Sequence, residues 1–361
     1  MKKYLTILLT AICLNSFSQT EQEIYEQAFQ KINCMLDETC SASLKEAVFI
    51  VENAYFSNTL DREQYDKRIT FASELARQLI ASRELVYNLP DREEVGKHAA
   101  IYSVLKDSIP ILVDSNTIVH IPPYTYDFND IWGNKEWSNM FVSKLLDTKK
   151  GNCHSLPLLY KIIADEIGAK AYISLAPNHM YIKLQNKANG WYNTELTSGV
   201  FPIDAWLMAS GYIHLDAIVY KLYMEALSDK QTIALFMTDL AKGYERKLGD
   251  TADLDFVLKC CDATLKYYPN YINALLLKAE TKKKKFDLLM AKQNTKNPQD
   301  ILTLPEAKHI FTEMTTEYSK IHDLGYRAMP ENMYMDWLLL LKEERNKYEN
   351  KEIINFKPIT K

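Results

Sequence analysis

Hydrophobic and polar positions follow a helical period over the first part of the chain. Between residues 21 and about 110, apolar side chains recur at steps of three and four, as in Leu44–Tyr55 and Tyr65–Leu79. This spacing predicts amphipathic helices that bury one face. Ser41 and Ser43 stand where a side chain would cap the first of these two helices. We therefore expect an N-terminal helical segment.

The pattern changes in the middle of the chain. Ile109–Asp130 is rich in proline and β-branched residues, which predicts loops and short extended segments. Helices are expected over Asn134–Leu146 and from Leu156 to a C-terminal cap at Gly168. The period then falls to two, which predicts three strands: Ala171–Ala176, His179–Gln185 and Trp191–Thr197. A helix followed by an antiparallel meander predicts an α+β fold.

A helical pattern returns in the last third of the chain. Pro269–Tyr271 separates Phe256–Tyr267 from Ile272–Lys285, and this junction resembles those between tetratricopeptide repeats. A second pair of helices is expected around Pro305 and Pro330. The pattern divides the chain into four parts: a leader over residues 1–18, an N-terminal helical segment over 19–110, an α+β core over 111–225, and a helical domain with tetratricopeptide-like repeats over 226–361.

The first residues have the layout of a secretory signal peptide. Met1–Lys3 is basic, Tyr4–Leu14 is an apolar run, and small residues follow it, with cleavage expected after Ser18. The run is well short of the roughly 20 residues that a membrane span needs. Cys13 allows a lipoprotein, but Ile12 stands where a small residue is expected. The sequence thus predicts an exported protein, periplasmic or secreted, without a membrane span.

Charge and motifs narrow the classes of function. The chain has 361 residues, of which 47 are acidic and 43 are basic, for a net charge of -4. Such mild acidity argues against nucleic-acid binding, which requires a basic face. The sequence has no His-Glu-x-x-His, no Cys-x-x-Cys and no glycine-rich phosphate loop. Neither a metal nor a nucleotide cofactor is therefore expected.

Five cysteines follow the expected cleavage site, and this odd number leaves at least one thiol unpaired in an oxidising compartment. Cys34 and Cys40 bracket a short polar stretch and would close a small loop. Cys260 and Cys261 are neighbours in a helical pattern, which indicates core or surface residues. Cys153 is left over, and this makes it a candidate reactive thiol.

Cys153 lies in a setting that suits thiol chemistry. It follows Gly151 and Asn152 where a loop enters a helix, and the exposed N–H groups of a helix start favour an anionic sulfur and an acyl oxyanion. Pro157 fits only a first turn, which allows the helix to begin near Ser155 with the cysteine just ahead of it. A single cysteine at a helix start is nevertheless more often structural than catalytic.

His179 begins the second predicted strand, where it would hold the proton of the thiol. Glu195 lies inside the third strand, where it would orient the imidazole. If the turn centres on Lys187, His179 faces Glu195 directly across the ladder. A turn shifted by one residue would turn Glu195 to the other face, and Asn193 is the substitute of the same parity. Taken singly, the histidine also fits a turn residue and the glutamate a solvent-facing strand residue.

The run Thr148–His154, followed by a helix, by His179 and by Gly190–Thr197, resembles the transglutaminase-like (papain-type) core. Pro177–His179 and Asn193–Glu195 are similar to motifs of its SirB-type branch, in which tetratricopeptide helices follow the core. One departure is the acid, a glutamate where core members carry an aspartate. Another is the residue before the aromatic that follows the histidine, which is a methionine here and small in the family.

The resemblance implies a core in which one helix packs on an antiparallel sheet. It also implies a triad: Cys153 as the nucleophile, His179 as the general base and then acid, and Glu195 as the orienting acceptor. An exported amidohydrolase, peptidase or acyltransferase, acting without a cofactor on a peptide or protein substrate, is the first hypothesis. The alternative is a catalytically inactive module that binds a protein partner through its helical repeats.

Overall fold

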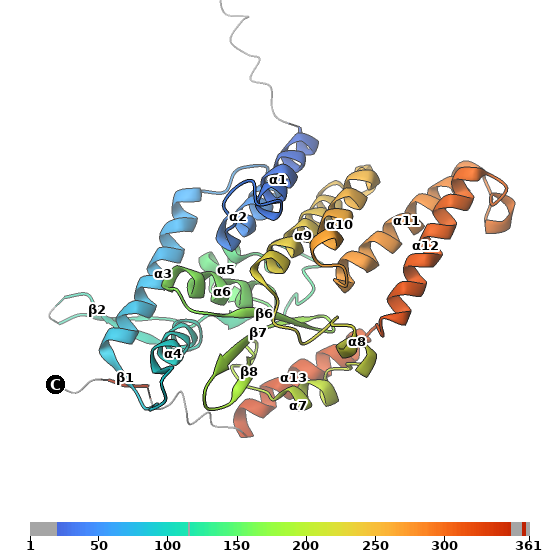
Figure 1. Ribbon diagram of the computed structural model, residues 1–361. Coiled ribbons are helices and arrows are strands. Elements are labelled where there is room, and N and C mark those ends of the chain that lie inside the picture. Colours follow the sequence, from blue (N-terminus) through green and yellow to red (C-terminus); the bar gives the residue numbers. More distant parts are fainter. Residues whose placement is uncertain (1–19, 115, 348–355, 359–361) are drawn as a thin grey trace, which may run out of the picture.

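The computed structural model describes residues 20–114, 116–347 and 356–358 (Figure 1). The predicted signal peptide, with Cys13, lies outside the described residues. The described chain is mostly helical, with a three-stranded antiparallel sheet and several two-stranded pairs, and is α+β in the broad sense. None of the helices in this part of the chain combines the length and the apolar composition that crossing a membrane requires.

The N-terminal part is helical, as its spacing predicts. Its helices are α1 (Glu21–Leu36), α2 (Leu44–Tyr55), α3 (Arg62–Ser82) and α4 (Arg92–Lys106). The bounds of α2 match the expected ones, and Oγ of Ser43 caps it by accepting a hydrogen bond from the N–H of Glu46. Cys34 and Cys40 form the expected disulfide, which closes the loop after α1.

A buried helix and a small meander form the centre of the molecule. They are α6 (Ser155–Ile167), β6 (Tyr172–Ala176), β7 (His179–Asn186) and β8 (Gly190–Thr194). The first ten residues of α6 are all buried, and the helix ends at Gly168, whose φ of 69° gives the left-handed cap that its position predicts. One side of α6 packs on the antiparallel sheet β6–β7–β8, while α3 and α4 cover other sides.

The turn between β7 and β8 lies one residue further along the chain than expected. Asn186 pairs with Gly190, so the turn centres on Ala188 rather than Lys187. Moving the centre of a turn by one residue shifts the cross-strand pairing by two, which leaves each side chain on its original face. The expectation that such a shift turns Glu195 to the other face is therefore wrong.

The helix expected over Asn134–Leu146 does not form as one piece. The segment contains a turn, a 3₁₀ helix at Trp137–Met140, and the start of α5 (Val142–Thr148). The carboxylate of Asp130 accepts hydrogen bonds from three successive N–H groups at positions 134 to 136, which fixes the turn. Glu52 of α2 then accepts the first two N–H groups of α5. Carboxylates from outside the segment thus set its helix boundaries.

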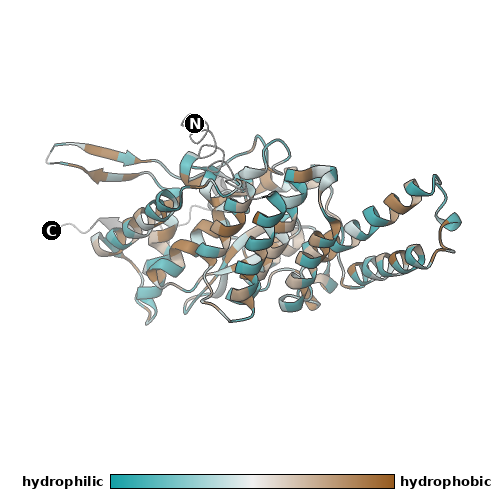
Figure 2. Cartoon of the chain, turned by 90° about the horizontal axis from the view of Figure 1, so that it is seen from above, coloured by the Kyte–Doolittle hydropathy of each residue, from teal (hydrophilic) through white to brown (hydrophobic). Residues whose placement is uncertain are grey.

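Short strands form the remaining pairs. They are β1 (Arg83–Leu85) with β9 (Phe356–Pro358), β2 (Ile109–Leu112) with β3 (Ile118–Ile121), and β4 (Thr125–Tyr126) with β5 (Lys150–Gly151). The extended segments expected between residues 109 and 130 are therefore β2, β3 and β4. The β2–β3 hairpin projects from one end of the molecule (Figure 2).

The C-terminal part contains the helices α7 (Asp204–Ser210), α8 (Leu215–Val219), α9 (Asp229–Leu248), α10 (Leu254–Tyr267), α11 (Ile272–Lys292), α12 (Pro305–Asp323) and α13 (Glu331–Lys347), with 3₁₀ turns at Gly249–Thr251 and Pro298–Asp300. α9 packs on α1, α2 and α10 and shares their hydrophobic core. α11 and α12 form an antiparallel arm, whereas α13 leaves this array and lies under the sheet beside α7 (Figure 1).

Candidate active site

Cys153 lies just ahead of α6, which begins at Ser155 as the position of Pro157 allows. The side-chain oxygen of Asn152 accepts hydrogen bonds from the N–H groups of His154 at 3.0 Å and Ser155 at 3.2 Å. Two of the N–H groups expected to favour an anionic sulfur are therefore engaged by a neighbouring side chain. Stabilisation of a thiolate has to come largely from other groups.

Gly151 permits the tight turn before the cysteine. A Cβ at this position would lie 2.4 Å from Oγ of Ser155 and 2.8 Å from Cδ1 of Leu145. The same Oγ accepts a hydrogen bond from the N–H of Asn152 at 3.1 Å. A larger residue would displace the atoms that hold this turn.

His179 and Glu195 are in direct contact, although not through the expected pairing. β8 ends before Glu195, which lies in an isolated bridge to Val200 rather than inside the strand. Oε2 of Glu195 is 2.5 Å from Nε2 of His179, the first residue of β7, and Oε1 accepts a hydrogen bond from the N–H of Thr197 at 2.6 Å. The two side chains are 0% and 2% exposed. In the observed register they meet diagonally across the sheet, at a distance that long side chains span.

Tyr334 of α13 joins the histidine to the thiol. Its Oη lies 3.0 Å from Nδ1 of His179 and donates a hydrogen bond to Sγ of Cys153 at 3.3 Å. In its neutral form the thiol also donates a weak hydrogen bond to the carbonyl oxygen of Asn178, 3.8 Å away. No feature of the sequence near Cys153 pointed to this tyrosine, which is 181 residues away along the chain. Its only local signal is an aromatic-rich helical pattern after a proline.

The hydrogen bonds form a consistent chain when the imidazole carries two protons. Nε2–H then donates to the Glu195 carboxylate, Nδ1–H donates to the oxygen of Tyr334, and the phenol donates to the sulfur. Each donor meets an acceptor, and the chain ends on a sulfur that accepts. This arrangement suits a thiolate and imidazolium pair.

The electrostatics of the buried groups agree with such a pair. Burial by itself would raise the pKa of Cys153, but the hydrogen bond and charge of His179 outweigh it and lower the pKa. Burial would lower the pKa of His179, and the Glu195 charge and the thiol together raise it to about 10. For Glu195, burial is outweighed by the charge of His179, so its pKa is lowered.

Aromatic side chains enclose the thiol. The Trp337 ring meets the His179 ring edge-on with centroids 4.8 Å apart, and the indole N–H donates to Oγ of Ser210 at 3.1 Å. Cys153 itself is 8% exposed. The hydroxyl of Tyr126 is also buried and makes no hydrogen bond of normal geometry, although the charge of Cys153 acts on it. α13 therefore covers the site, and the Tyr126 hydroxyl lies near both the sulfur and Tyr334.

The other sequence candidates have different partners. Asn193, the alternative acceptor, donates to Asp204 at 2.7 Å and to the carbonyl oxygen of Pro202 at 2.9 Å. Cys260 and Cys261 are free thiols in the core of α10, and burial raises both of their pKa values. They are poor nucleophiles at neutral pH.

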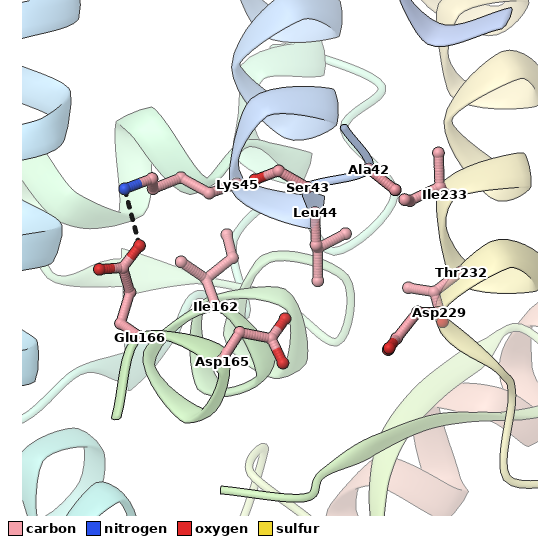
Figure 3. Close-up of a pocket in the computed structure, with 10 residues that line it drawn as sticks. All are labelled: Ala42, Ser43, Leu44, Lys45, Ile162, Asp165, Glu166, Asp229, Thr232 and Ile233. Carbon is pink, nitrogen blue, oxygen red and sulfur yellow. Dashed lines mark ion pairs between the residues drawn. The ribbon is translucent and has the colours of Figure 1, made fainter. Parts of the chain in front are cut away.

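A cavity of about 260 Å³ lies elsewhere, between α2, the C-terminal half of α6 and the start of α9 (Figure 3). Its acidic side chains are balanced by lysines: Lys45 pairs with Glu166 at 2.7 Å, and the nearby Lys161 pairs with both Asp165 and Asp229. None of the three candidate residues lines this cavity. Among the described residues there is no cluster of three or more side chains suited to hold a metal ion.

Comparison with known proteins does not assign a family. No family model matches the chain, and no curated protein is significantly similar to it. A solved structure that aligns is the crystal structure of menin, which reveals the binding site for the Mixed Lineage Leukemia (MLL) protein. The two are 12% identical, and the alignment covers 94% of this chain and 93% of menin with a TM-score of 0.31. Similarity at this level does not establish a shared fold.

Proposed function

We propose that this protein is a thiol enzyme that cleaves or transfers the acyl group of an amide. The observation that carries the proposal is the continuous hydrogen-bonded chain from Glu195 through His179 and Tyr334 to Cys153. A cysteine acts as a nucleophile when a histidine holds its proton and a third group fixes the ring. Here Glu195 fixes the ring, Tyr334 links the ring to the thiol, and all four side chains are almost fully buried.

The reaction follows from the protonation states. The Cys153 thiolate attacks the amide carbonyl, and the oxyanion accepts a hydrogen bond from the nearby hydroxyl of Tyr126. His179 gives its Nδ1 proton to the leaving amine as the carbon–nitrogen bond breaks, which leaves a thioester. Water, or an acceptor amine, then attacks the thioester carbon and gives a proton to Nδ1 of His179. The carbon–sulfur bond breaks, which releases the acid or the new amide and restores the Cys153 thiolate. Glu195 keeps the imidazole oriented throughout.

The order of elements supports a transglutaminase-like core for this site. Cys153 precedes the buried helix α6, His179 opens the strand β7, and Glu195 follows the strand β8. This is the order that the sequence motifs imply. The disulfide between Cys34 and Cys40 fits the exported location expected from the leader, because such bonds persist in oxidising compartments.

Substrate has to displace α13 to reach the sulfur. Tyr334 and Trp337 are 1% and 2% exposed and cover the thiol and the histidine. A peptide acyl group requires Sγ and the Tyr334 hydroxyl to separate, since this hydroxyl is bonded to both the sulfur and Nδ1 of His179. We therefore place a movement of α13 before the chemical step.

The burial of the site also supports a second function. A thiol that stays covered would leave a transglutaminase-like scaffold whose role is to bind a protein through its helical surfaces. The α11–α12 arm, which projects away from the core, suits such contacts (Figure 2). The two functions differ in whether Cys153 reacts in the native protein.

The pH dependence of alkylation separates the two functions. Native protein is treated with iodoacetamide over a range of pH, and the labelled peptides are quantified by mass spectrometry. For an active site, Cys153 reacts well below the pH at which an ordinary thiol does, and His179→Ala abolishes that advantage. Cys260 and Cys261 serve as internal controls, since burial raises their pKa values.

Two outcomes would overturn the proposal that this protein is a thiol enzyme. In the first, Cys153 reacts only at the pH at which an ordinary thiol does, or above it. In the second, it stays unreactive even after Trp337→Ala loosens α13. Either result favours the binding module.

A further inference from the structure

His154, the residue after the candidate nucleophile, makes two hydrogen bonds that the proposed mechanism does not use. Its Nδ1 lies 2.9 Å from the carbonyl oxygen of Met140, and its Nε2 lies 3.0 Å from Oδ2 of Asp239 on α9. The histidine and aspartate side chains are 17% and 18% exposed, so the pair is largely shielded from water. No pattern in the sequence connects these two residues, which are 85 positions apart.

Both partners of the ring are acceptors. A backbone carbonyl has no proton to donate, and neither does an ionised carboxylate. Each ring nitrogen must therefore carry a proton for both contacts to be hydrogen bonds. A neutral imidazole has only one such proton, so this geometry selects the positively charged imidazolium. Although burial acts against the charge, the charge and hydrogen bond of Asp239 outweigh it and raise the pKa of His154 to about 9.

Other charged groups near the ring do not cancel this charge. Glu52 of α2 feels the charge of His154, but it is bonded to the N–H groups of α5, and burial raises its pKa to about 7. Tyr271 faces Asp239 and has a pKa raised by burial, so it stays neutral. Asp239 is thus the counterion that His154 contacts directly, on the ring edge occupied by Nε2.

A nearby positive charge matters for the thiol because two N–H groups at the start of α6 are already engaged. Asn152 takes up the N–H groups of His154 and Ser155. The charge of His154 lowers the pKa of Cys153, in addition to the larger contributions of His179 and Tyr334. A fixed imidazolium therefore fills the electrostatic role that a free helix terminus would have.

We infer that His154 is a positioning residue, a permanent imidazolium held by Asp239 and the Met140 carbonyl, which stabilises the Cys153 thiolate. The inference rests on the proposed function, since it concerns the same thiol. It also gives α9 a part in the site, because the residue that keeps His154 charged belongs to that helix.

Asp239→Asn tests this inference by the sign of its effect. If His154 is charged, loss of Asp239 lets the ring lose its proton, and the thiolate loses its stabilising neighbour. The midpoint pH of Cys153 alkylation then rises by about one unit. At a fixed pH below the midpoint, this corresponds to an alkylation rate about tenfold lower. If His154 were neutral, the substitution would only remove a negative charge, and the midpoint would fall or stay unchanged. Asp229→Asn, the same charge change on the same helix, is the matched control.

His154→Gln provides a second variant with the same expected direction. It removes the positive charge and leaves Asp239 in place, so the midpoint rises by at least as much as in Asp239→Asn. A third measurement follows the imidazole NMR signals of the wild-type protein as the pH is raised. The signals of His154 are assigned by their loss in His154→Gln, and we expect them to show a protonated ring at about pH 8.

The outcomes distinguish this inference from the proposed function. A wild-type Cys153 that reacts like Cys260 means that the proposed enzyme fails. An activated wild-type Cys153, together with unchanged or lowered midpoints in Asp239→Asn and His154→Gln, overturns only the role of His154. A neutral His154 ring at pH 7 in the NMR titration overturns it as well.

Discussion

Replacing Glu195 by glutamine removes a charge from the buried chain and keeps its shape. The carboxylate accepts from Nε2 of His179 and from the N–H of Thr197. A glutamine offers only one acceptor oxygen for these two donors, and its other terminus is an NH₂. If the oxygen stays on Thr197, the NH₂ faces Nε2 and forces the imidazole proton onto Nδ1. That tautomer cannot take the proton of Cys153.

The structure sets the size of this effect. A hydrogen bond to a charged group contributes about 1.5–3 kcal/mol, and solvent does not screen it here because both side chains are at most 2% exposed. One pKa unit corresponds to about 1.4 kcal/mol, so the midpoint pH of Cys153 alkylation should rise by about 1–2 units in Glu195→Gln. At a fixed pH below the midpoint, the alkylation rate should fall about 10- to 100-fold.

The assay is iodoacetamide labelling of native protein over a range of pH, quantified on the peptide that carries Cys153. Asp204→Asn is the matched control, since its carboxylate bonds to Lys183 and Asn193 rather than to His179. Circular dichroism establishes that each variant is folded. An unchanged midpoint in folded Glu195→Gln, or an equal shift in Asp204→Asn, would refute the reasoning.

Three further substitutions test the surroundings of the site. Trp337→Ala should raise the maximal alkylation rate of Cys153 at high pH and expose α13 to limited proteolysis. The substitution should cost about 3–5 kcal/mol in unfolding free energy. An unchanged alkylation rate and digestion pattern would mean that this ring does not hold α13 in place. Glu52→Gln should flatten the pH dependence of stability. Burial raises the pKa of Glu52 from 4.5 to about 7, so in the wild type its contribution of about 3 kcal/mol is complete below about pH 4.5 and lost as the pH rises through about 7. Urea unfolding at about pH 5 and about pH 8 measures the unfolding free energy at each pH. An equal change in this free energy between the two pH values in both proteins would contradict the prediction. Gly151→Ala should cost about 1–3 kcal/mol in thermal or urea unfolding, because its Cβ would meet neighbours at 2.4 and 2.8 Å; a variant as stable as the wild type would mean that this turn is not tightly packed.

The spacing of residues along the chain was sufficient to predict those helices and strands whose bounds depend on their own residues. The bounds of α2 and its Ser43 cap follow from apolar periodicity and one hydroxyl. The cap of α6 at Gly168 follows from a residue that adopts positive φ without strain. The three strands appear close to their predicted positions because their period of two is set by side-chain alternation.

Spacing failed where a distant side chain sets the backbone. Asp130 and Glu52 interrupt and restart the segment before α6, and Glu52 lies 90 residues from the N–H of Val142 that it binds. The predicted pairing between β7 and β8 was also wrong, by two positions. The contact between His179 and Glu195 survived that error only because the shift preserved the face of the sheet.

The sequence by itself determined which residue types lie at the start of α6 and along β7 and β8, because those positions depend on short-range periodicity and turn chemistry. It therefore placed Cys153 just ahead of α6 and His179 at the start of β7, whereas Glu195, expected inside the third strand, lies just beyond the end of β8. Only the tertiary structure decided what surrounds them: Tyr334 on the sulfur, and Asp239 on the neighbouring His154. These contacts join residues 181 and 85 positions apart, and the packing of α13 and α9 on the rest of the molecule, rather than any local pattern, brings them together.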